Sequence, residues 1–278
     1  MTDQILRKQK IKVTEKCSKL NKSIAFTGKG GVGKTTCLIL FLKFLIENKK
    51  DYRILVIDAD PDANIADVIG KKIHFKDTIA GKMTNLRKKI EKNMIFPYKD
   101  KKQAIEAEIF NCFLHTKYFD VIEMGRTEGE GCYCNVNNVL KYALDIISEN
   151  YDFVLVDTPA GLEHFARKTG KDVSDLMIII DPSKMSFHTL KRILDISGEV
   201  SLNFNKYWVL GNRFLDGKQE ILIKKLKTLN KAKIQLIGFI PEDIELMKYN
   251  LFGKNLLNLP ADNAAYRKIK EIFKNIII

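Results

Sequence analysis

The sequence predicts an α/β fold with a doubly wound, mostly parallel sheet of about seven strands, covered by helices on both faces. Three observations support this prediction. Short runs rich in Val, Ile and Leu alternate with longer helical patterns, as in chains of βαβ units. The runs show little period-2 alternation, which is typical of strands buried on both faces. Glycine-rich and acidic segments directly follow several runs, where open α/β sheets bind their ligands.

The expected elements follow from these patterns. The predicted strands are Ser23–Thr27, Arg53–Ile57, Phe119–Glu123, Phe153–Val156, Leu176–Ile180, Tyr207–Leu210 and Ile234–Ile240. Helices are expected at Thr35–Asn48, Val136–Asn150 and Met185–Val200. The lysine-rich segment His74–Thr116 has helical patterns and no strand signal. It therefore predicts a helical insertion between strands and not a second domain.

Length and composition indicate one domain in the cytoplasm. With 278 residues, of which 45% are hydrophobic, residues 23–278 can bury one large core, after a basic N-terminal extension of residues 1–22. The extension has no uninterrupted apolar run, so we do not expect a signal peptide. No stretch has 18 consecutive apolar residues, so no membrane span is expected. Five cysteines without an export signal favour a reducing compartment.

The chain is strongly basic, with a formal charge of +13. Such a charge attracts polyanions. The lysines are scattered along the chain, however, which is typical of solvated helix faces, so charge alone does not indicate a nucleic-acid partner. The terminal segment Ala264–Ile278 is amphipathic. We expect it to pack on the sheet, and a membrane-surface anchor is the alternative.

A P-loop motif follows the first predicted strand. The segment Gly28–Thr35 reads GKGGVGKT, between a strand and a helix, as the motif requires. Backbone N–H groups of such a loop surround phosphate oxygens, and the helix N-terminus adds partial positive charge. Lys34 is expected to neutralise the β- and γ-phosphates, and Thr35 to hold Mg²⁺. The expected nucleotide-binding residues here are Gly28, Gly30, Gly31, Val32, Gly33, Lys34, Thr35 and Thr36.

Two further strands end in carboxylates. Asp58 and Asp60 follow the second strand, and Asp157 ends the apolar run before Thr158-Pro159-Ala160-Gly161. Carboxylates beside a P-loop can orient water or support Mg²⁺. We expect Asp157 to support Mg²⁺, in the manner of a Walker B aspartate. A solvated turn or a helix cap is the alternative for the pair after the second strand.

Lys29 departs from an ordinary P-loop. A cation directly after the first glycine cannot easily reach the phosphates that its own loop surrounds, but it can reach those of a second copy. The sequence KGGVGKTT resembles the deviant Walker A motif of the superfamily that contains MinD, ParA, ArsA and the nitrogenase iron protein. The resemblance implies a MinD-like P-loop NTPase fold and a nucleotide-dependent homodimer in which Lys29 acts across the interface.

The same resemblance implies roles for other residues. Asp60 matches the aspartate that positions the attacking water. Asn212 matches the asparagine that reads adenine, and Pro241 and Glu242 match a second loop that contacts the base. The chain has no Asn-Lys-x-Asp motif for guanine, so ATP/ADP is the expected nucleotide. Lys29, Lys34, Asp60 and Asp157 are the expected catalytic residues.

A Cys-x-Cys pair lies in a glycine-rich segment. In an extended chain, Cys132 and Cys134 point the same way, so both sulfurs can face one ion. Two thiolates do not complete a structural Zn²⁺ site, which takes four ligands, but a two-fold axis would supply four. Two unrelated free cysteines are the alternative.

The stretches MGRTEGEGCYCNVNNVL and DTPAGLEHFAR resemble the CooC group of ATPases. Members of that group help to insert nickel into carbon monoxide dehydrogenase, and a related factor serves acetyl-CoA synthase. The resemblance implies that Cys132 and Cys134 bind Ni²⁺ or Zn²⁺ at a dimer interface and that such an enzyme is the client. Two alternatives remain open: a ParA- or MinD-type positioning ATPase, and an iron-protein-like electron donor with a dimer-bridging cluster.

Overall fold

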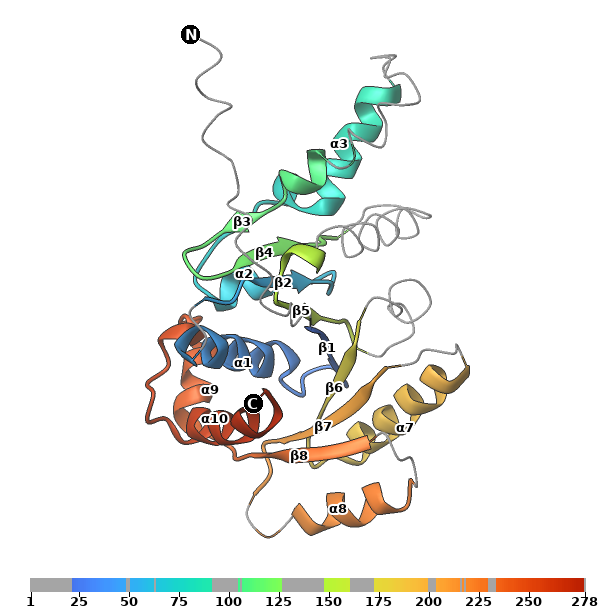
Figure 1. Cartoon of the computed structure of the whole chain (residues 1–278), viewed down its shortest axis with the longest axis vertical. Coiled ribbons are helices and arrows are strands. Elements are labelled where there is room, and N and C mark those ends of the chain that lie inside the picture. The colour runs from blue at the N-terminus through green and yellow to red at the C-terminus, as the bar shows by residue number, and fades with distance from the viewer. Residues whose placement is uncertain are drawn as a thin grey trace.

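The computed structural model describes residues 22–48, 51–62, 64–91, 105, 107–126, 148–160, 173–199, 204–215, 217, 219–229 and 234–277. One eight-stranded sheet runs through them in the order β3-β4-β2-β5-β1-β6-β7-β8 (Figure 1). The strands are β1 (Lys22–Gly28), β2 (Ile54–Asp58), β3 (Leu114–His115), β4 (Asp120–Glu123), β5 (Phe153–Asp157), β6 (Asp175–Ile180), β7 (Lys206–Asn212) and β8 (Ile234–Ile240). All neighbouring strands are parallel except β3 and β4.

Helices flank the sheet. The α-helices are α1 (Lys34–Asn48), α2 (Ile65–Val68), α3 (Ile79–Glu91), α7 (Lys184–Glu199), α8 (Gln219–Lys227), α9 (Ile244–Leu251) and α10 (Ala264–Ile277). Single 3₁₀ turns lie at Phe75–Asp77, Ser148–Asn150 and Leu256–Asn258. The doubly wound, mostly parallel α/β prediction is therefore confirmed.

The described part of the chain has one strand more than predicted. Leu114–His115 pairs antiparallel with β4, inside the segment that was expected to be helical without strands. Two residues are too short to show a strand period, so this edge strand depends on its partner and not on a local pattern. The helical part of that prediction holds for α3. Strand β1 begins at Lys22, one residue inside the predicted extension.

Some predictions fall outside the described residues. They include residues 1–21 and most of the predicted helix Val136–Asn150. The last three residues of that helix, Ser148–Asn150, form a 3₁₀ turn.

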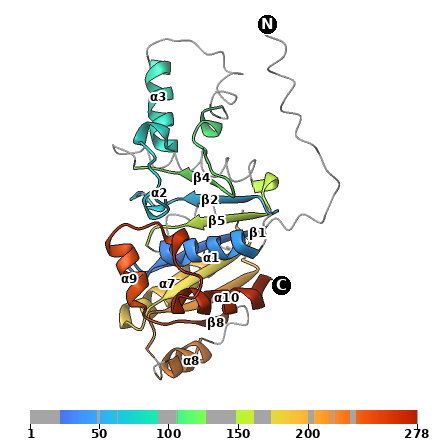
Figure 2. The ribbon, with the colours of Figure 1, turned by 90° about the vertical axis from the view of Figure 1, so that its left-hand side faces the viewer.

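The core has two layers, one on each face of the sheet. On one face, α1 and α10 lie side by side against the sheet, and the rings of Phe41 and Phe273 are 4.2 Å apart (Figure 2). On the other face, α7 packs through apolar residues that include Leu190 and Ile193. Helix α10 buries Ile269 and Phe273, so the terminal helix packs as expected. No helix in the described part is long and apolar enough to cross a bilayer.

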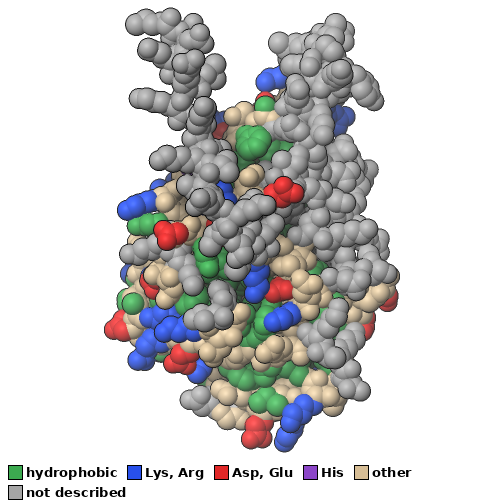
Figure 3. Space-filling model, in the orientation of Figure 1, with side chains coloured by type: hydrophobic (Ala, Val, Ile, Leu, Met, Phe, Trp, Pro, Cys, Tyr) green, Lys and Arg blue, Asp and Glu red, His purple; other side chains and the backbone are tan. Residues whose placement is uncertain are grey.

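The parallel strands position the site. Because β1, β2, β4, β5, β6, β7 and β8 run the same way, their carboxyl ends meet at one edge of the sheet. On the face drawn in Figure 3, the described basic and acidic side chains are interspersed and do not separate by sign.

Candidate nucleotide-binding site

The loop Gly28–Gly33 connects β1 to α1 at this edge, as the motif predicts. Glycine is required at both its ends. Gly28 has φ +150°, and a Cβ there would lie 2.3 Å from the Ile179 carbonyl oxygen. Gly33 has φ +92°, and a Cβ there would lie 2.6 Å from the Asn212 side-chain nitrogen. L-residues rarely adopt such angles, and neither position has room for a side chain. The loop therefore packs tightly against the ends of β6 and β7.

The side chains of Thr35 and Asp157 are hydrogen-bonded to each other next to the P-loop. The Thr35 hydroxyl donates to Asp157 Oδ2 at 2.5 Å. The other carboxylate oxygen, Oδ1, is buried and has no hydrogen-bond partner within the described residues. Burial raises the pKa of Asp157 to about 6, although the Thr35 hydrogen bond and Lys34 lower it. A buried, unsatisfied carboxylate oxygen beside a threonine hydroxyl is a donor set that suits Mg²⁺.

Asp58 shapes the loop that carries Asp60. It is buried, and its two oxygens accept from the backbone N–H of Asp60 at 3.1 Å and of Ile65 at 2.9 Å. Burial raises the pKa of Asp58 well above its usual value, and the nearby Asp157 raises it further. Asp60 is half-buried, and its carboxylate accepts from the N–H of Asp62 at 3.1 Å. Asp58 thus supports Asp60, whose role with water stays a prediction.

Glu123 is a site residue that was not predicted from the sequence. Asp58 is register partner to Asp157 on one side and to Glu123 on the other, so three buried carboxylates lie in a row. Glu123 Oε1 accepts from the N–H of Ala66, in the first turn of α2, at 3.1 Å. Burial raises its pKa to about 7. The sequence did contain a signal for Glu123, because the predicted strand Phe119–Glu123 ends in a carboxylate. The strands before Asp58 and Asp157 end in the same way.

The side chains of Asn212 and Arg213 donate hydrogen bonds to carbonyl groups of the P-loop. The Asn212 amide donates to the Val32 carbonyl at 2.7 Å, and Arg213 Nη1 donates to the Gly31 carbonyl at 3.2 Å. Arg213 has φ +58°, a strained angle for a non-glycine residue. The sequence predicted a contact of Asn212 with adenine and no role for Arg213. The structure brings both to the phosphate loop, and the contact of Asn212 with adenine stays a prediction.

Pro241 and Glu242 follow β8, next to Asn212 in the sheet, since Asn212 pairs with Ile240. Glu242 is exposed and Pro241 is half-buried. The structure therefore places these predicted base contacts beside the P-loop edge.

Lys29 is half-buried at the start of the loop. Its charge acts on Asp181, which follows the neighbouring strand β6. Although burial opposes it, the pKa of Asp181 is lowered, because Ser183 donates hydrogen bonds to it and Lys29 is nearby. The action of Lys29 on a second copy stays a prediction.

Cys132 and Cys134 lie outside the described residues. Among the residues that are described, no three His, Cys, Asp or Glu side chains come together to hold a metal ion. Cys37 and Cys112 are buried, and burial raises the pKa of each thiol to about 12, so both stay protonated at neutral pH.

Comparison with known proteins agrees with this geometry. The family model described as AAA domain, AAA_31, matches residues 21–208. An uncharacterized ATP-binding protein of Methanocaldococcus jannaschii is 39% identical over 254 residues, which cover 91% of this chain and 98% of the relative.

A second relative has a name that states a function. The carbon monoxide dehydrogenase accessory protein CooC of Rhodospirillum rubrum is 30% identical over 197 residues, which cover 64% of this chain and 70% of that protein.

Among solved structures, a ParA family ATPase from Chlorobium tepidum superposes with a TM-score of 0.68 at 16% identity. That match covers 93% of this chain and all of the other. It supports the fold alone.

Proposed function

Because the chain belongs to the AAA domain family AAA_31 of P-loop ATPases, we propose that it hydrolyses Mg·ATP as a homodimer and uses the cycle to insert nickel into carbon monoxide dehydrogenase or acetyl-CoA synthase. One observation carries the ATPase proposal. The Thr35 hydroxyl, directly after the phosphate loop, donates to one oxygen of Asp157, whose other oxygen is buried without a partner among the described residues.

Each residue of the site has a distinct task in this proposal. Backbone N–H groups of Gly30–Thr36 bind the phosphates, and Lys34 neutralises their charge. Thr35 and Asp157 are the residues that would hold Mg²⁺, which when bound neutralises the charge developing on the phosphates. Asp60 orients the attacking water, on the loop that Asp58 shapes.

The homodimer completes the site. Lys29 would reach the phosphates of the partner copy and stabilise the charge of the transition state there. Relatives of the MinD and ParA type share this fold, which supports the dimer. The resemblance of KGGVGKTT to the deviant Walker A motif points to the same arrangement.

Nickel is the proposed cargo. Cys132 and Cys134 of two copies would supply four thiolates, and hydrolysis would release the ion to the client. The sequence similarity to CooC supports this assignment. The proposal predicts about one nickel ion per dimer, because four sulfurs close one tetrahedral site.

Anaerobic metal analysis with Mg·ATP tests this proposal. Nickel binding should be lost in Cys132→Ser and Cys134→Ser, while ATP hydrolysis is kept. Cys112→Ala is the matched control, since that sulfur is buried in the core. Unchanged nickel binding in both serine variants would reject the cargo, and absence of hydrolysis in wild type would reject the ATPase.

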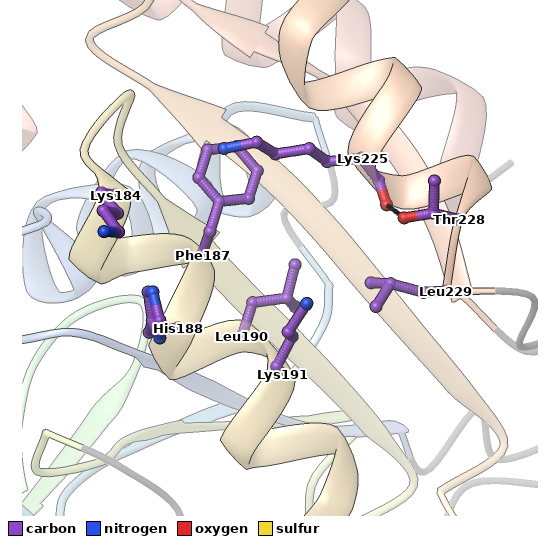
Figure 4. A pocket seen from close by; sticks show the side chains of 8 residues that line it. All are labelled: Lys184, Phe187, His188, Leu190, Lys191, Lys225, Thr228 and Leu229. Atoms are coloured by element: carbon purple, nitrogen blue, oxygen red, sulfur yellow. Dashed lines mark hydrogen bonds between the residues drawn. The ribbon is translucent and has the colours of Figure 1, made fainter.

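A basic cavity favours a second candidate, a ParA-type ATPase that acts on a polyanion. A cavity of about 210 Å³ lies between α7 and α8, lined by Lys184, Phe187, His188, Leu190, Lys191, Lys225, Thr228 and Leu229 (Figure 4). Lys225 lies across the Phe187 ring, 3.9 Å from its centroid. No lining residue is acidic, and no ion pair joins these lysines to another described residue.

Retention on DNA at increasing salt tests the second candidate. If this cavity binds phosphates, Lys191→Glu with Lys225→Glu should elute at lower salt than wild type. Lys268→Glu, on the exposed face of α10, is the control. Equal elution of all three proteins would reject it.

A further inference from the structure

Helix α2 is capped by side chains from neighbouring strands. It has only four residues, so the N–H groups of its first turn need acceptors from elsewhere. Asn64, at the N-cap position, makes no side-chain hydrogen bond to this turn. The N–H of Ile65 donates to Asp58 at 2.9 Å, and the N–H of Ala66 donates to Glu123 at 3.1 Å. Two carboxylates at the ends of β2 and β4 therefore take the place of the N-cap side chain.

These bonds matter for the loop that carries Asp60, because this loop ends where α2 begins. At its start, the N–H of Ala59 donates to the carbonyl oxygen of Asp157, at the end of β5, at 2.9 Å. Beyond its end, Ala66 is bonded to Glu123, at the end of β4. Strands β4, β2 and β5 are neighbours in the sheet. The loop is therefore fixed on both sides to the same sheet, and the place of Asp60 depends on both attachments.

A second contact between the end of β4 and this loop is weaker. Arg126 donates to Asp62 at 3.0 Å, but the two side chains are 73% and 66% exposed. An exposed ion pair of this kind contributes little. Glu123 is 3% exposed, and its hydrogen bond to Ala66 is buried. Loss of the acceptor would leave a buried N–H unsatisfied, which costs more than loss of a surface pair. Glu123 is therefore the attachment that fixes this side of the loop.

We propose that Glu123 is a positioning residue for ATP hydrolysis, which holds the first turn of α2 and so keeps Asp60 in place to orient the attacking water. This inference rests on the proposed role of Asp60. Strands β2 and β5 lie between Glu123 and β1, which leads into the P-loop. Glu123 therefore acts on the rate of hydrolysis and not on the binding of the phosphates.

Steady-state hydrolysis by variants of similar size tests the hydrogen bond. Glu123→Met fills the space without an acceptor, so kcat should fall about tenfold while KM stays within about twofold. Glu123→Ala removes the acceptor in another way and should have the same effect. Glu123→Gln keeps an oxygen for the Ala66 N–H, so its kcat should stay within about threefold of wild type. Burial raises the pKa of Glu123 to about 7, so the carboxyl carries only part of its charge at neutral pH, as a neutral amide can imitate.

Asp175→Leu is the matched control. Asp175 is 4% exposed, begins β6 at the opposite edge of the sheet, and accepts from Trp208 Nε1 at 3.1 Å. Its replacement also leaves a buried N–H without an acceptor, but far from Asp60. It should lower the thermal stability and leave kcat within about twofold of wild type. Thermal unfolding checks that every variant is folded at the assay temperature.

A double variant tests whether Glu123 acts through Asp60. If it does, replacing Glu123 has no further effect once the Asp60 carboxylate is gone. Asp60→Ala/Glu123→Met should therefore hydrolyse ATP at the rate of Asp60→Ala. A merely structural role of Glu123 would lower the rate in both backgrounds.

The outcomes separate this inference from the proposed function. A wild-type kcat in Glu123→Met, or a further loss in the double variant, would overturn the positioning role of Glu123 while that of Asp60 stands. Glu123→Gln as slow as Glu123→Met, or an equal loss in Asp175→Leu, would also overturn it, because the hydrogen bond to Ala66 would not be the cause. If Asp60→Ala hydrolyses ATP as fast as wild type, the proposed role of Asp60 fails, and this inference fails with it.

Discussion

The Thr35 hydroxyl and the Asp157 carboxylate are joined by a hydrogen bond of 2.5 Å, which connects the first turn of α1 to the end of β5. This contact links the P-loop motif to the predicted Walker B strand, 122 residues further along the chain. One oxygen of Asp157 remains without a partner in the described structure. The pair is therefore a position from which Mg²⁺ can be held with little rearrangement of either side chain.

Replacing Asp157 tests this position. Asp157→Asn keeps the size of the side chain and removes its charge, so Mg-dependent ATP hydrolysis should fall by about 10²-fold or more. The buried carboxylate has a pKa raised to about 6, so the neutral amide should also stabilise the nucleotide-free protein at pH 8. Steady-state hydrolysis and thermal unfolding measure the two effects. A variant with normal hydrolysis would contradict the Mg²⁺ assignment.

Glu123 should make stability depend on pH. Its pKa rises from 4.5 to about 7 in the folded chain, so the folded state binds more protons than the unfolded state between these values. Stability should then fall as pH rises from 4.5 to 7, by about 3 kcal/mol from this group. Glu123→Gln keeps the oxygen that accepts from Ala66 and should flatten this dependence. Urea unfolding at pH 5 and 8 measures it. An identical pH slope in both proteins would refute the prediction.

Gly33 should not tolerate a side chain. Gly33→Ala would place a Cβ 2.6 Å from the Asn212 amide nitrogen, at a backbone angle that alanine rarely adopts. We expect nucleotide affinity to fall at least tenfold, because the loop can no longer close on Asn212. Gly31→Ala is the comparison, since it also has positive φ but nothing within 4 Å of its added carbon. Nucleotide titration should show a larger loss for Gly33→Ala.

The ring of Phe273 anchors the terminal helix. It is fully buried and lies 4.2 Å, between centroids, from the ring of Phe41 on α1. Phe273→Ala should lower the free energy of unfolding by about 3–5 kcal/mol, because it leaves a large cavity between α10 and α1. Chemical denaturation measures this loss. The exposed Lys274→Ala, one residue on, should change stability by less than about 0.5 kcal/mol.

The sequence predicted those parts of the fold that have strong local patterns. Three elements were predicted to within a residue or two, because each has a hydrophobic pattern next to a recognisable motif. They are the strand before Gly28, the helix from Lys34 and the strand that ends at Asp157. The edge strand Leu114–His115 has no such pattern, because this strand forms only by pairing with the neighbouring strand Asp120–Glu123. Asn212 was found by resemblance, but its hydrogen bond to Val32 arises from packing across 180 residues of chain. No sequence period encodes a contact of that kind.

The burial of most of α1 has a consequence for motion. The helix that begins at Lys34 packs against the sheet and against α10 through buried apolar side chains, so a shift of the phosphate loop at its start would disturb the core. The segment that follows Asp60 is exposed at Asp62, which pairs with the exposed Arg126, and the N–H groups of Ile65 and Ala66 donate to the buried Asp58 and Glu123. We therefore expect the exposed segment at Asp62, more than α1, to shift when the terminal phosphate is lost.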